Sequence, residues 1–271
     1  MPERGARPAA SVDVAILNFV RDTLALADVE LHKLWRDPLE LLTRAIQPAL
    51  WLLIFGQVMG RLKAIPTGNM SYLTFMTPGI LAQSVLFIAI FYGISVIWER
   101  DLGILQKLLA TPAPRSALVL GKALSAGVRG LSQGFIIYLL ALALHIPLRF
   151  RVGAIAGVAG FIILGSALFS TFSLSVACLV RTRERFMGVG QVLTMPLFFT
   201  SNAIYPLSIM PPWLRALSKA NPLSYQVDAL RVLMVEGGQS IFGLGKDFTV
   251  LFLGLVLLVL ITAKLYPNVV Q

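Results

Sequence analysis

Six long apolar segments constrain the fold of this 271-residue chain more than any other feature of its sequence. A helix that crosses a bilayer needs about 20 mostly apolar residues, because the hydrocarbon core is about 30 Å thick and each residue advances about 1.5 Å. The segments are residues 39–59, 72–98, 117–144, 152–180, 186–205 and 248–266. They leave little room for a soluble domain. We therefore predict an all-α polytopic membrane protein, in which residues 1–271 form one domain with six transmembrane helices.

Composition and charge support this class and exclude others. Hydrophobic residues make up 57% of the chain and charged residues only 13%, whereas a soluble domain carries about 25% charged residues. The net charge of +10 fits loops that face anionic lipid. No basic cluster is interleaved with aromatic residues, so we predict no nucleic-acid binding. The single cysteine, Cys178, excludes an intrachain disulfide and a metal site built from several thiolates.

The region before the first span has its own pattern. Residues 1–10 are rich in Pro, Arg and Ala and are predicted to form a disordered tail. Residues 12–36 carry apolar side chains every three or four positions with charges between them, which predicts an amphipathic helix in the membrane interface, anchored by Trp35. We see no continuous apolar stretch typical of a cleavable signal peptide there. The first span then begins after Asp37, at Pro38.

The segment between the fifth and sixth spans is too polar and too rich in proline to cross the bilayer as one straight helix. Residues 206–236 are predicted to form one or two short helices that lie in the interface or dip into it, a re-entrant segment. Irregular backbone at that depth is tolerated only where protein or water covers it.

Lys and Arg counts predict the orientation, because cytoplasmic loops are enriched in these residues. The short loops that we assign to the cytoplasm carry Arg4, Arg7, Arg21, Lys33, Arg36, Arg100, Lys107, Arg115, Lys122, Arg181, Arg183, Arg185 and Lys264. The opposite side carries Arg61, Lys63, Arg149, Arg151, Arg215, Lys219, Arg231 and Lys246. We therefore expect a multi-pass protein of the plasma (inner) membrane with both termini in the cytoplasm.

The sequence lacks the motifs of a self-contained enzyme. A P-loop requires an upstream glycine and a following Ser or Thr, and both Gly121-Lys122 and Gly245-Lys246 lack them. There is no His-Glu-x-x-His motif, and His32 and His145 fall near predicted membrane edges. We predict no catalytic residue, no metal site and no ATP hydrolysis by this chain.

Two alternative functions follow from single features. An ion-coupled secondary carrier usually needs a carboxylate at membrane depth, and the predicted spans hold none well inside. An intramembrane serine protease has only Ser166, which follows Gly165, and the distant His145 in its favour. A Gly-Ser step in a span is usually a helix-packing feature. Mutating His145 tests the protease, and transport by the chain alone tests the carrier.

Arg129 is the one deep charge in the predicted spans, with Ser132 and Gln133 one turn further on. Burying a charge is costly unless it is paired or faces water. Two interpretations stay open. Arg129 either contacts an anionic or polar head group, or it donates hydrogen bonds to carbonyls of a neighbouring helix.

The polar stretch WERDLGILQKLLATPAPRS, residues 98–116, is more than a simple loop. Leu102, Leu105, Leu108 and Leu109 recur at helical spacing and the charges take the other face, which predicts a short amphipathic helix. Pro112 and Pro114 end it. The pattern alone fits a helix lying on the lipid surface equally well.

Two spaced motifs make the chain resemble the ABC-2 type permeases, the membrane subunits of type V ATP-binding-cassette exporters. The first lies before the third span and comprises Glu99, Arg100, Gly103, Leu108, Leu109, Thr111, Pro112 and Arg115. The second comprises Pro206, Leu207, Met210, Pro211, Trp213, Leu214, Asn221, Pro222, Leu223, Tyr225, Asp228 and Arg231. The similarity extends to the daunorubicin-exporter-like drug-resistance permeases and the nodulation lipo-oligosaccharide exporters.

The resemblance implies partners that the sequence itself lacks. A separate ABC ATPase subunit would hold ATP and Mg, so this chain would need no cofactor of its own. A second permease chain, identical or different, would complete a dimer in the lipid membrane, with an interface lined by the first, second and fifth spans. The resemblance also implies that the complex exports an amphipathic drug, lipid or glycolipid.

It also implies roles for particular segments. Residues 98–111 would be the cytoplasmic coupling helix that sits in a cleft of the ATPase, with Glu99, Arg100, Leu102, Gly103, Leu105, Leu108, Leu109, Thr111, Pro112 and Arg115 as its candidate residues. Residues 12–36 would be the connecting helix. The extracellular re-entrant helices would form a gate with Pro206, Pro211, Trp213, Asn221, Pro222, Tyr225, Asp228 and Arg231.

Within the gate, Asp228 and Arg231 are three residues apart and could pair on one helix face, a role in holding the fold. Candidate residues of the transport path are Gln47, Gln57, Arg129, Phe198, Phe199 and Asn202, for each of which packing is the commoner role.

Overall fold

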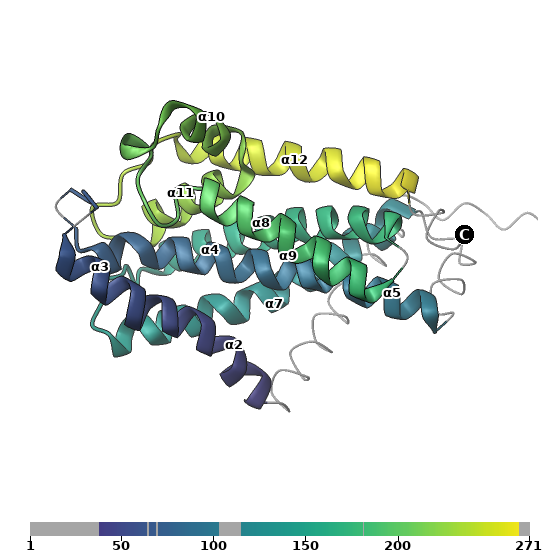
Figure 1. Cartoon of the computed structure of the whole chain (residues 1–271), viewed down its shortest axis with the longest axis horizontal. Helices are drawn as coiled ribbons and strands as arrows, with labels where there is room; N and C mark the ends of the chain where they lie inside the picture. Colours follow the sequence, from purple (N-terminus) through teal and green to yellow (C-terminus); the bar gives the residue numbers. More distant parts are fainter. Residues whose placement is uncertain (1–37, 64, 69, 103–114, 181, 266–271) are drawn as a thin grey trace, which may run out of the picture.

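The protein is described by a computed structural model that covers residues 38–63, 65–68, 70–102, 115–180 and 182–265. Side chains are described for these ranges except at 38–42, 95–96, 99 and 115–118. Figure 1 shows an elongated bundle of helices whose long members run roughly side by side. The predicted tail, the connecting helix at 12–36 and residues 103–114 lie outside the described residues.

The elements follow the predicted segments closely. They are α2 (Pro38–Leu50), the π-helix η1 (Trp51–Gly56), α3 (Gln57–Leu62), α4 (Tyr72–Tyr92), α5 (Ile94–Asp101), α7 (Arg115–Ala143), α8 (Val152–Leu179), α9 (Arg183–Thr200), the 3-10 helix η2 (Leu207–Ile209), α10 (Pro212–Ala220), α11 (Pro222–Met234) and α12 (Leu244–Leu265). The described residues contain no β-strand, only an isolated antiparallel bridge between Leu148 and Val235. The all-α polytopic class is confirmed.

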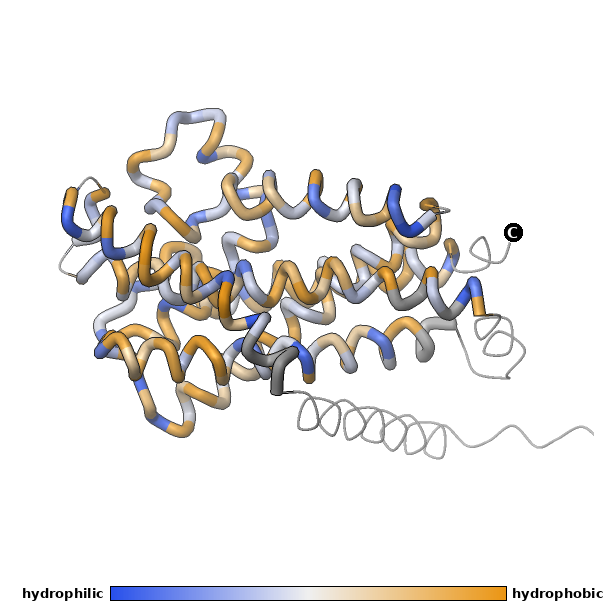
Figure 2. The backbone as a smooth tube through the Cα atoms, turned by 60° about the horizontal axis from the view of Figure 1, so that its bottom comes forward, coloured by the Kyte–Doolittle hydropathy of each residue, from blue (hydrophilic) through white to orange (hydrophobic). Residues whose placement is uncertain are grey.

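Five of the described helices are long and apolar enough to cross a membrane: Thr43–Leu62, Tyr72–Tyr92, Val119–Ala143, Val152–Leu179 and Leu244–Leu265. Figure 2 shows apolar residues along most of their length. The remaining predicted span corresponds to α9, whose 18 residues reach about 27 Å. It is helical but falls outside this set, because it begins with three charged residues, Arg183, Glu184 and Arg185, and contains Gln191 and Pro196. A sixth crossing at α9 stays a prediction.

The second and fourth spans form the centre of the bundle. Helix α8 packs against α7, α12, α4 and α11, and α4 packs against α8, α7 and α11. The largest cluster of buried residues includes Met76, Ile80, Leu81, Val85 and Leu86 of α4. Most of α4 is thus enclosed by the chain itself, which leaves little of the second span free for the expected dimer interface. The lining of that interface stays a prediction.

Small polar residues let the helices approach in this centre. In α8, Thr171 donates a hydrogen bond to the carbonyl of Ala167 at 2.7 Å, and Ser175 lies 2.6 Å from the Thr262 hydroxyl of α12. Where no water is present, the hydroxyl groups of such side chains form hydrogen bonds within their own helix or with a neighbouring helix. The serines of the fourth span are therefore packing residues.

The second span ends earlier than predicted, at a break between α4 and α5. Gly93 caps α4, and a Cβ there would lie 2.1 Å from the Ser173 hydroxyl of α8 and 2.9 Å from the Phe186 ring of α9. The close approach of α8 and α9 requires a glycine at this point. Helix α5 continues from it toward the predicted coupling segment.

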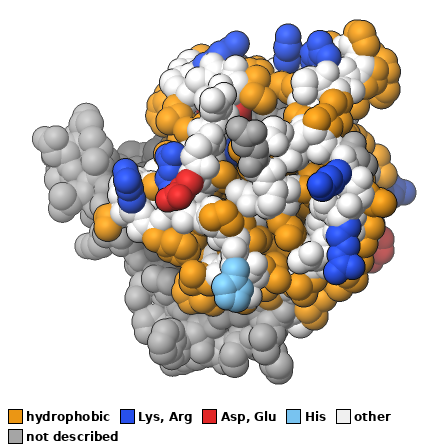
Figure 3. All heavy atoms as spheres, turned by 90° about the vertical axis from the view of Figure 1, so that its left-hand side faces the viewer, with side chains coloured by type: hydrophobic (Ala, Val, Ile, Leu, Met, Phe, Trp, Pro, Cys, Tyr) orange, Lys and Arg blue, Asp and Glu red, His pale blue; other side chains and the backbone are white. Residues whose placement is uncertain are grey.

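The described loops of the two predicted groups lie at opposite ends of the bundle, which we call the α5 end and the α10 end (Figure 1). Of the described residues, Arg100, Lys122, Arg183, Arg185 and Lys264 belong to the α5 end. Figure 3 faces the α10 end and shows Lys and Arg side chains spread over it. For the described loops, the predicted grouping is confirmed. That the α5 end faces the cytoplasm stays a prediction.

Candidate functional site

The α5 end holds a network that joins the start of the predicted coupling segment to α9. Asp101, the last residue of α5, accepts hydrogen bonds from Arg183 at 2.8 Å (Nη2) and 3.2 Å (Nε). The Arg183 guanidinium also lies 3.8 Å from the ring centroid of Trp98. Arg100 donates to the second carboxylate oxygen of Asp101 at 3.2 Å. Trp98 and Asp101 of the 98–102 stretch thus both contact Arg183 of α9.

Electrostatics favour the charged form of this carboxylate. The hydrogen bond from Arg183 is the main cause that lowers the pKa of Asp101 below its ordinary value, with a further contribution from Arg100. Because the pKa is lowered, the ion pair is complete above the ordinary pKa of an aspartate and is lost only as the pH falls through the lowered value. Arg183 is positioned for this contact by Thr182, whose hydroxyl caps α9. The pair therefore joins the end of α5 to the start of α9.

The other predicted coupling residues are only partly described. Arg100 is half-buried, and Leu102 is 66% exposed next to the end of α5. Glu99 lies in α5 and Arg115 begins α7, but their side chains are outside the described set. Gly103, Leu105, Leu108, Leu109, Thr111 and Pro112 lie outside the described residues. The coupling role of the stretch therefore stays a prediction.

At the α10 end, Asp228 organises the turn that leads into α12. Its fully buried carboxylate accepts the Ser240 hydroxyl at 2.6 Å and the backbone N–H groups of Ile241 and Phe242, each at 3.0 Å. Buried N–H groups need such acceptors, because an unpaired one costs about 1–3 kcal/mol. Helix α11 thus holds the start of the last span.

Arg231 is fixed in another direction. Its guanidinium donates to the Asn202 carbonyl at 2.8 Å and to the Phe75 carbonyl at 3.4 Å, and it lies 4.0 Å from the centroid of the Phe75 ring. Burial lowers the pKa of Arg231 to about 10, and the charge of Asp228 partly opposes this. The arginine therefore stays charged at neutral pH.

The predicted Asp228–Arg231 pair needs correction. Both side chains are described, and no hydrogen bond or ion pair joins them. Each instead binds backbone groups of a distant segment, because these buried backbone groups need partners. The fold-holding role stands, with different contacts.

The other gate residues also shape this end. Asn221 caps α11 and donates to the Leu197 carbonyl of α9 at 2.6 Å, and Pro222 begins the helix. Tyr225 donates to the Lys219 carbonyl at 2.7 Å. Trp213 is 65% exposed on α10, which Pro211 precedes, and Pro206 precedes η2. The predicted short helices are confirmed as α10 and α11, and Figure 1 shows α11 lying within the bundle while α10 lies at its edge.

The sequence analysis missed one residue of this region, Asp247. It lies in the first turn of α12, is fully buried, and its two carboxylate oxygens have no hydrogen-bond donor among the described residues. The Asp228 carboxylate is its neighbour. The predicted sixth span began at residue 248, whereas α12 begins at Leu244, so Asp247 was treated as a loop residue. Helix-start signals, an acidic residue in the first turn after Gly243, could have found it.

Two of the six path candidates line cavities. Gln57 is exposed and lines a cavity of about 780 Å³ between α3 and the 63–71 loop. Arg129 lines a smaller cavity of about 260 Å³ with Arg44, Phe87, Phe91 and Tyr92, and it lies 5.1 Å from the Tyr92 ring centroid. The second cavity lies along α2, α4 and α7 and combines two cations with aromatic walls.

The remaining path candidates differ in exposure. Gln47 is exposed on α2. Phe198 is fully buried and packs edge-on against Trp51 at 5.6 Å, so within this chain it is a core residue. Phe199 is 45% exposed. Asn202 is buried, and its side-chain amide has no hydrogen-bond partner among the described residues.

The structure removes the basis for an intramembrane protease. Ser166 is buried in the middle of α8 and faces Gly130 of α7, where a Cβ would lie 2.2 Å from the serine hydroxyl. His145 is exposed beyond the end of α7. His145 lies in the connection between α7 and α8, which begins at Val152. Ser166 is 14 residues further along α8, so about 21 Å of helix separates it from this connection. Among the described residues, no group of three or more His, Cys, Asp or Glu could hold a metal ion.

Comparison with known proteins places this geometry in a family context. The family model described as "ABC-2 type transporter" matches residues 21–235. The chain is 31% identical over 225 residues to a putative transport permease, ycf38, of Cyanophora paradoxa, which covers 82% of this chain and 77% of that protein. It is 28% identical over 220 residues to the daunorubicin resistance ABC transporter permease protein DrrB1 of Streptomyces coeruleorubidus. The match covers 75% of this chain and 74% of that protein. It is 27% identical over 209 residues to the inner membrane transport permease YadH of Escherichia coli K12. The match covers 74% of this chain and 78% of that protein.

Proposed function

We propose, from the premise that this chain belongs to the ABC-2 type transporter family, that it is the membrane-spanning permease of an exporter driven by a separate ABC ATPase subunit. The exported molecule would be an amphipathic drug, lipid or glycolipid. A protein similar to this chain is named for daunorubicin resistance, which fits cargo of this kind. The chain would lie in the plasma (inner) membrane with both termini in the cytoplasm.

The observation that carries this proposal is the connection at the α5 end. Asp101 follows directly from α4 and α5, and Arg183 ties it to α9. A partner that displaces the 98–111 segment would therefore move two parts of the bundle together. The chain has no P-loop, so ATP and Mg would reside on the partner. We expect a dimer with a second permease chain, identical or different, in contact through α2–α3 and α9.

The test is co-purification of the tagged chain with an ABC ATPase encoded beside its gene, followed by measurement of ATP hydrolysis. We expect a stable complex, and we expect Glu99→Ala or Leu105→Asp to uncouple or dissociate it. If no ATPase binds, or if both variants behave as the wild type does, the coupling role is wrong and the segment lies on the lipid surface.

A structure-based prediction concerns Asp101→Asn. This change removes the charge that Arg183 and Arg100 share, so α5 and α9 would no longer move as one unit. We expect about a two- to fivefold loss of substrate-stimulated ATP hydrolysis, in the range of an exposed ion pair, with the complex still formed. The effect should be constant between about pH 6 and 8, because the pKa of Asp101 is lowered.

The matched control is Glu184→Gln, which removes a negative charge from an exposed position of the same α9 turn. It should leave the rate unchanged. A double-mutant cycle with Arg183→Gln tests the contact itself, since the second change should add little once Asp101 is replaced. Additive losses would argue against coupling through this pair.

One observation favours a second candidate, an ion-coupled carrier. The buried Asp247 beside Asp228 provides the carboxylate that the sequence analysis did not find in a span. It lies only one turn inside α12, so we rank this function second. Uptake or release of cargo by the chain alone in liposomes, driven by a proton gradient and abolished by Asp247→Asn, would establish it.

A further inference from the structure

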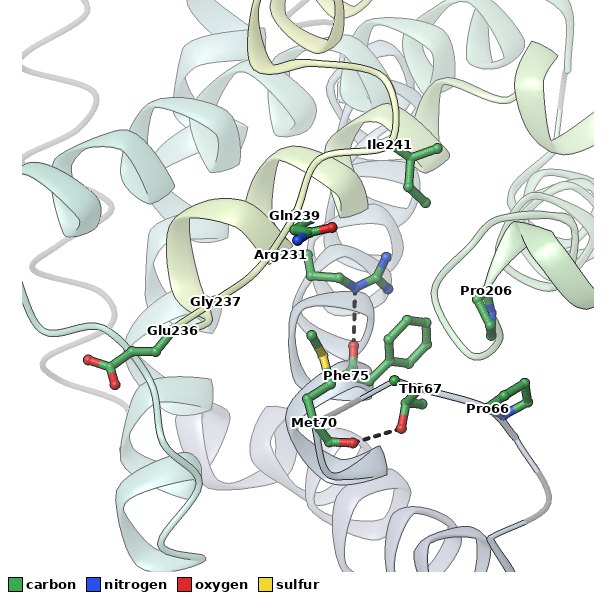
Figure 4. A pocket seen from close by; sticks show the side chains of 11 residues that line it. Pro66, Thr67, Met70, Phe75, Pro206, Arg231, Glu236, Gly237, Gln239 and Ile241 are labelled. Atoms are coloured by element: carbon green, nitrogen blue, oxygen red, sulfur yellow. Dashed lines mark hydrogen bonds between the residues drawn. The ribbon is translucent and has the colours of Figure 1, made fainter.

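A cavity of about 630 Å³ opens at the α10 end, over the side chain of Arg231. Figure 4 shows it between the 63–71 loop, the start of α4, Pro206 and the segment that follows α11. Its volume falls in the range of about 300–1,000 Å³ that is usual for small-molecule sites.

The polar group at its base is a buried cation with unused donor capacity. Arg231 is 3% exposed, and the Nε and Nη2 groups donate to the carbonyls of Phe75 and Asn202. The third nitrogen, Nη1, has no hydrogen-bond partner among the described residues. A guanidinium presents five N–H donors, and a buried one left without an acceptor is costly. Because Arg231 lines the cavity, a fixed positive charge borders this space, and its remaining donors suit an oxyanion.

The walls beside this charge are mostly apolar. Met70, Phe75, Pro206 and Ile241 line the cavity. The Thr67 hydroxyl is already used, because it donates to the Met70 carbonyl at 2.7 Å. Gln239 and the exposed Glu236 also line the cavity, and Figure 4 shows the Glu236 carboxylate pointing away from Arg231. A free inorganic anion would leave these walls unused, and an apolar molecule would leave Nη1 unsatisfied.

We propose that this cavity binds the anionic head group, phosphate or carboxylate, of an amphipathic molecule, with the oxyanion on Arg231 and the adjoining apolar part against Met70, Phe75 and Ile241. The proposal rests on the proposed function, because it identifies the cavity as the place where the head group of the cargo is held at the α10 end. It selects anionic amphipathic cargo over cationic cargo.

Binding is measured with the full-length chain in nanodiscs of neutral phosphatidylcholine, without any ATPase subunit. The probes are dodecyl phosphate, dodecyl maltoside and inorganic phosphate. The dissociation constant of each is measured by calorimetry. Dodecyl phosphate should bind at least about tenfold more tightly than either of the others, because only it offers both the charge and the apolar chain.

Variants assign the site. Arg231→Gln should weaken dodecyl phosphate binding about ten- to hundredfold, since it removes a charge-assisted hydrogen bond. Gln239 is exposed, so changing it should not affect folding. Gln239→Glu should weaken binding about tenfold and Gln239→Lys should strengthen it. The control is Arg151→Gln, an exposed arginine at the same end that does not line the cavity.

The proposal is overturned if dodecyl phosphate binds no more tightly than dodecyl maltoside or inorganic phosphate. It is also overturned if both Gln239 variants bind it as the wild type does, a result that does not depend on whether Arg231→Gln folds. Because the assay contains no ATPase, a failure here leaves the coupling experiment unaffected. An uncoupled ATPase in that experiment likewise leaves the binding result valid.

Discussion

Gly79→Ala is expected to be among the most damaging single changes in this protein. The added Cβ would lie 2.4 Å from the carbonyl oxygen of Ala203 and 2.7 Å from its Cα, well inside contact distance. These are backbone atoms, which cannot rotate away as a side chain does. Overpacking of a buried site typically costs about 1–3 kcal/mol, and a clash with backbone belongs at or above the upper end. We expect a fall of about 10 °C in the unfolding midpoint of the purified protein.

The effect should extend to the whole α10 end. Residues 201–205 are held on α4 by the Tyr72 hydroxyl, which donates to the Ile204 carbonyl at 2.9 Å, and on α11 by Arg231, which donates to the Asn202 carbonyl. Displacing Ala203 would strain both contacts. Gly121→Ala is the control, because a Cβ at that position of α7 meets no atom within 4 Å. Equal thermal stability of the two variants would show that α4 and the 201–205 segment are not in the described contact.

Asp228→Ala is expected to destabilise the protein by about 2–5 kcal/mol. The change leaves the buried N–H groups of Ile241 and Phe242 and the Ser240 hydroxyl without their acceptor. Each unpaired buried donor costs about 1–3 kcal/mol, although the turn can relax toward water in part. The measurement is the free energy of unfolding in detergent micelles, or the unfolding midpoint where unfolding is irreversible.

The neighbouring aspartate provides a matched control with the opposite expectation. Asp247→Asn also removes a carboxylate, but one whose oxygens have no hydrogen-bond donor among the described residues and which lies beside Asp228. Asparagine has the same shape and carries no charge beside the Asp228 carboxylate, so stability should stay unchanged or rise. Asp228→Asn, which can still accept the N–H groups, should fall between the two. A loss at Asp247→Asn as large as that at Asp228→Ala would contradict this account.

Local pattern in the sequence predicted the helices, because helix formation in a membrane depends on nearby residues. Apolar runs of span length correspond to α4, α7, α8 and α12, and the prolines and Asn221 mark the starts of α10 and α11. Local signals were weaker at element ends. The second span breaks at Gly93, and the last span begins at Leu244 rather than four residues later.

The candidate site was predictable only in part, for the same reason. Spacing suggested that Asp228 and Arg231 bind each other, since they are three residues apart on a helix. In the structure Asp228 binds residues 240–242, and Arg231 binds the carbonyls of Phe75 and Asn202. These distant segments contribute buried backbone groups that need partners. No periodicity in the sequence contains that information.

The sequence by itself determined that the chain is helical and membrane-spanning, and which loops lie at a common end, since apolar length and Lys and Arg positions are local properties. The tertiary structure alone decided that α4 lies in the centre, that Asp101 binds Arg183, and that Arg231 lies at the base of a cavity. Those facts depend on which surfaces meet. Packing and the pairing of buried polar groups decide this between residues far apart in the chain.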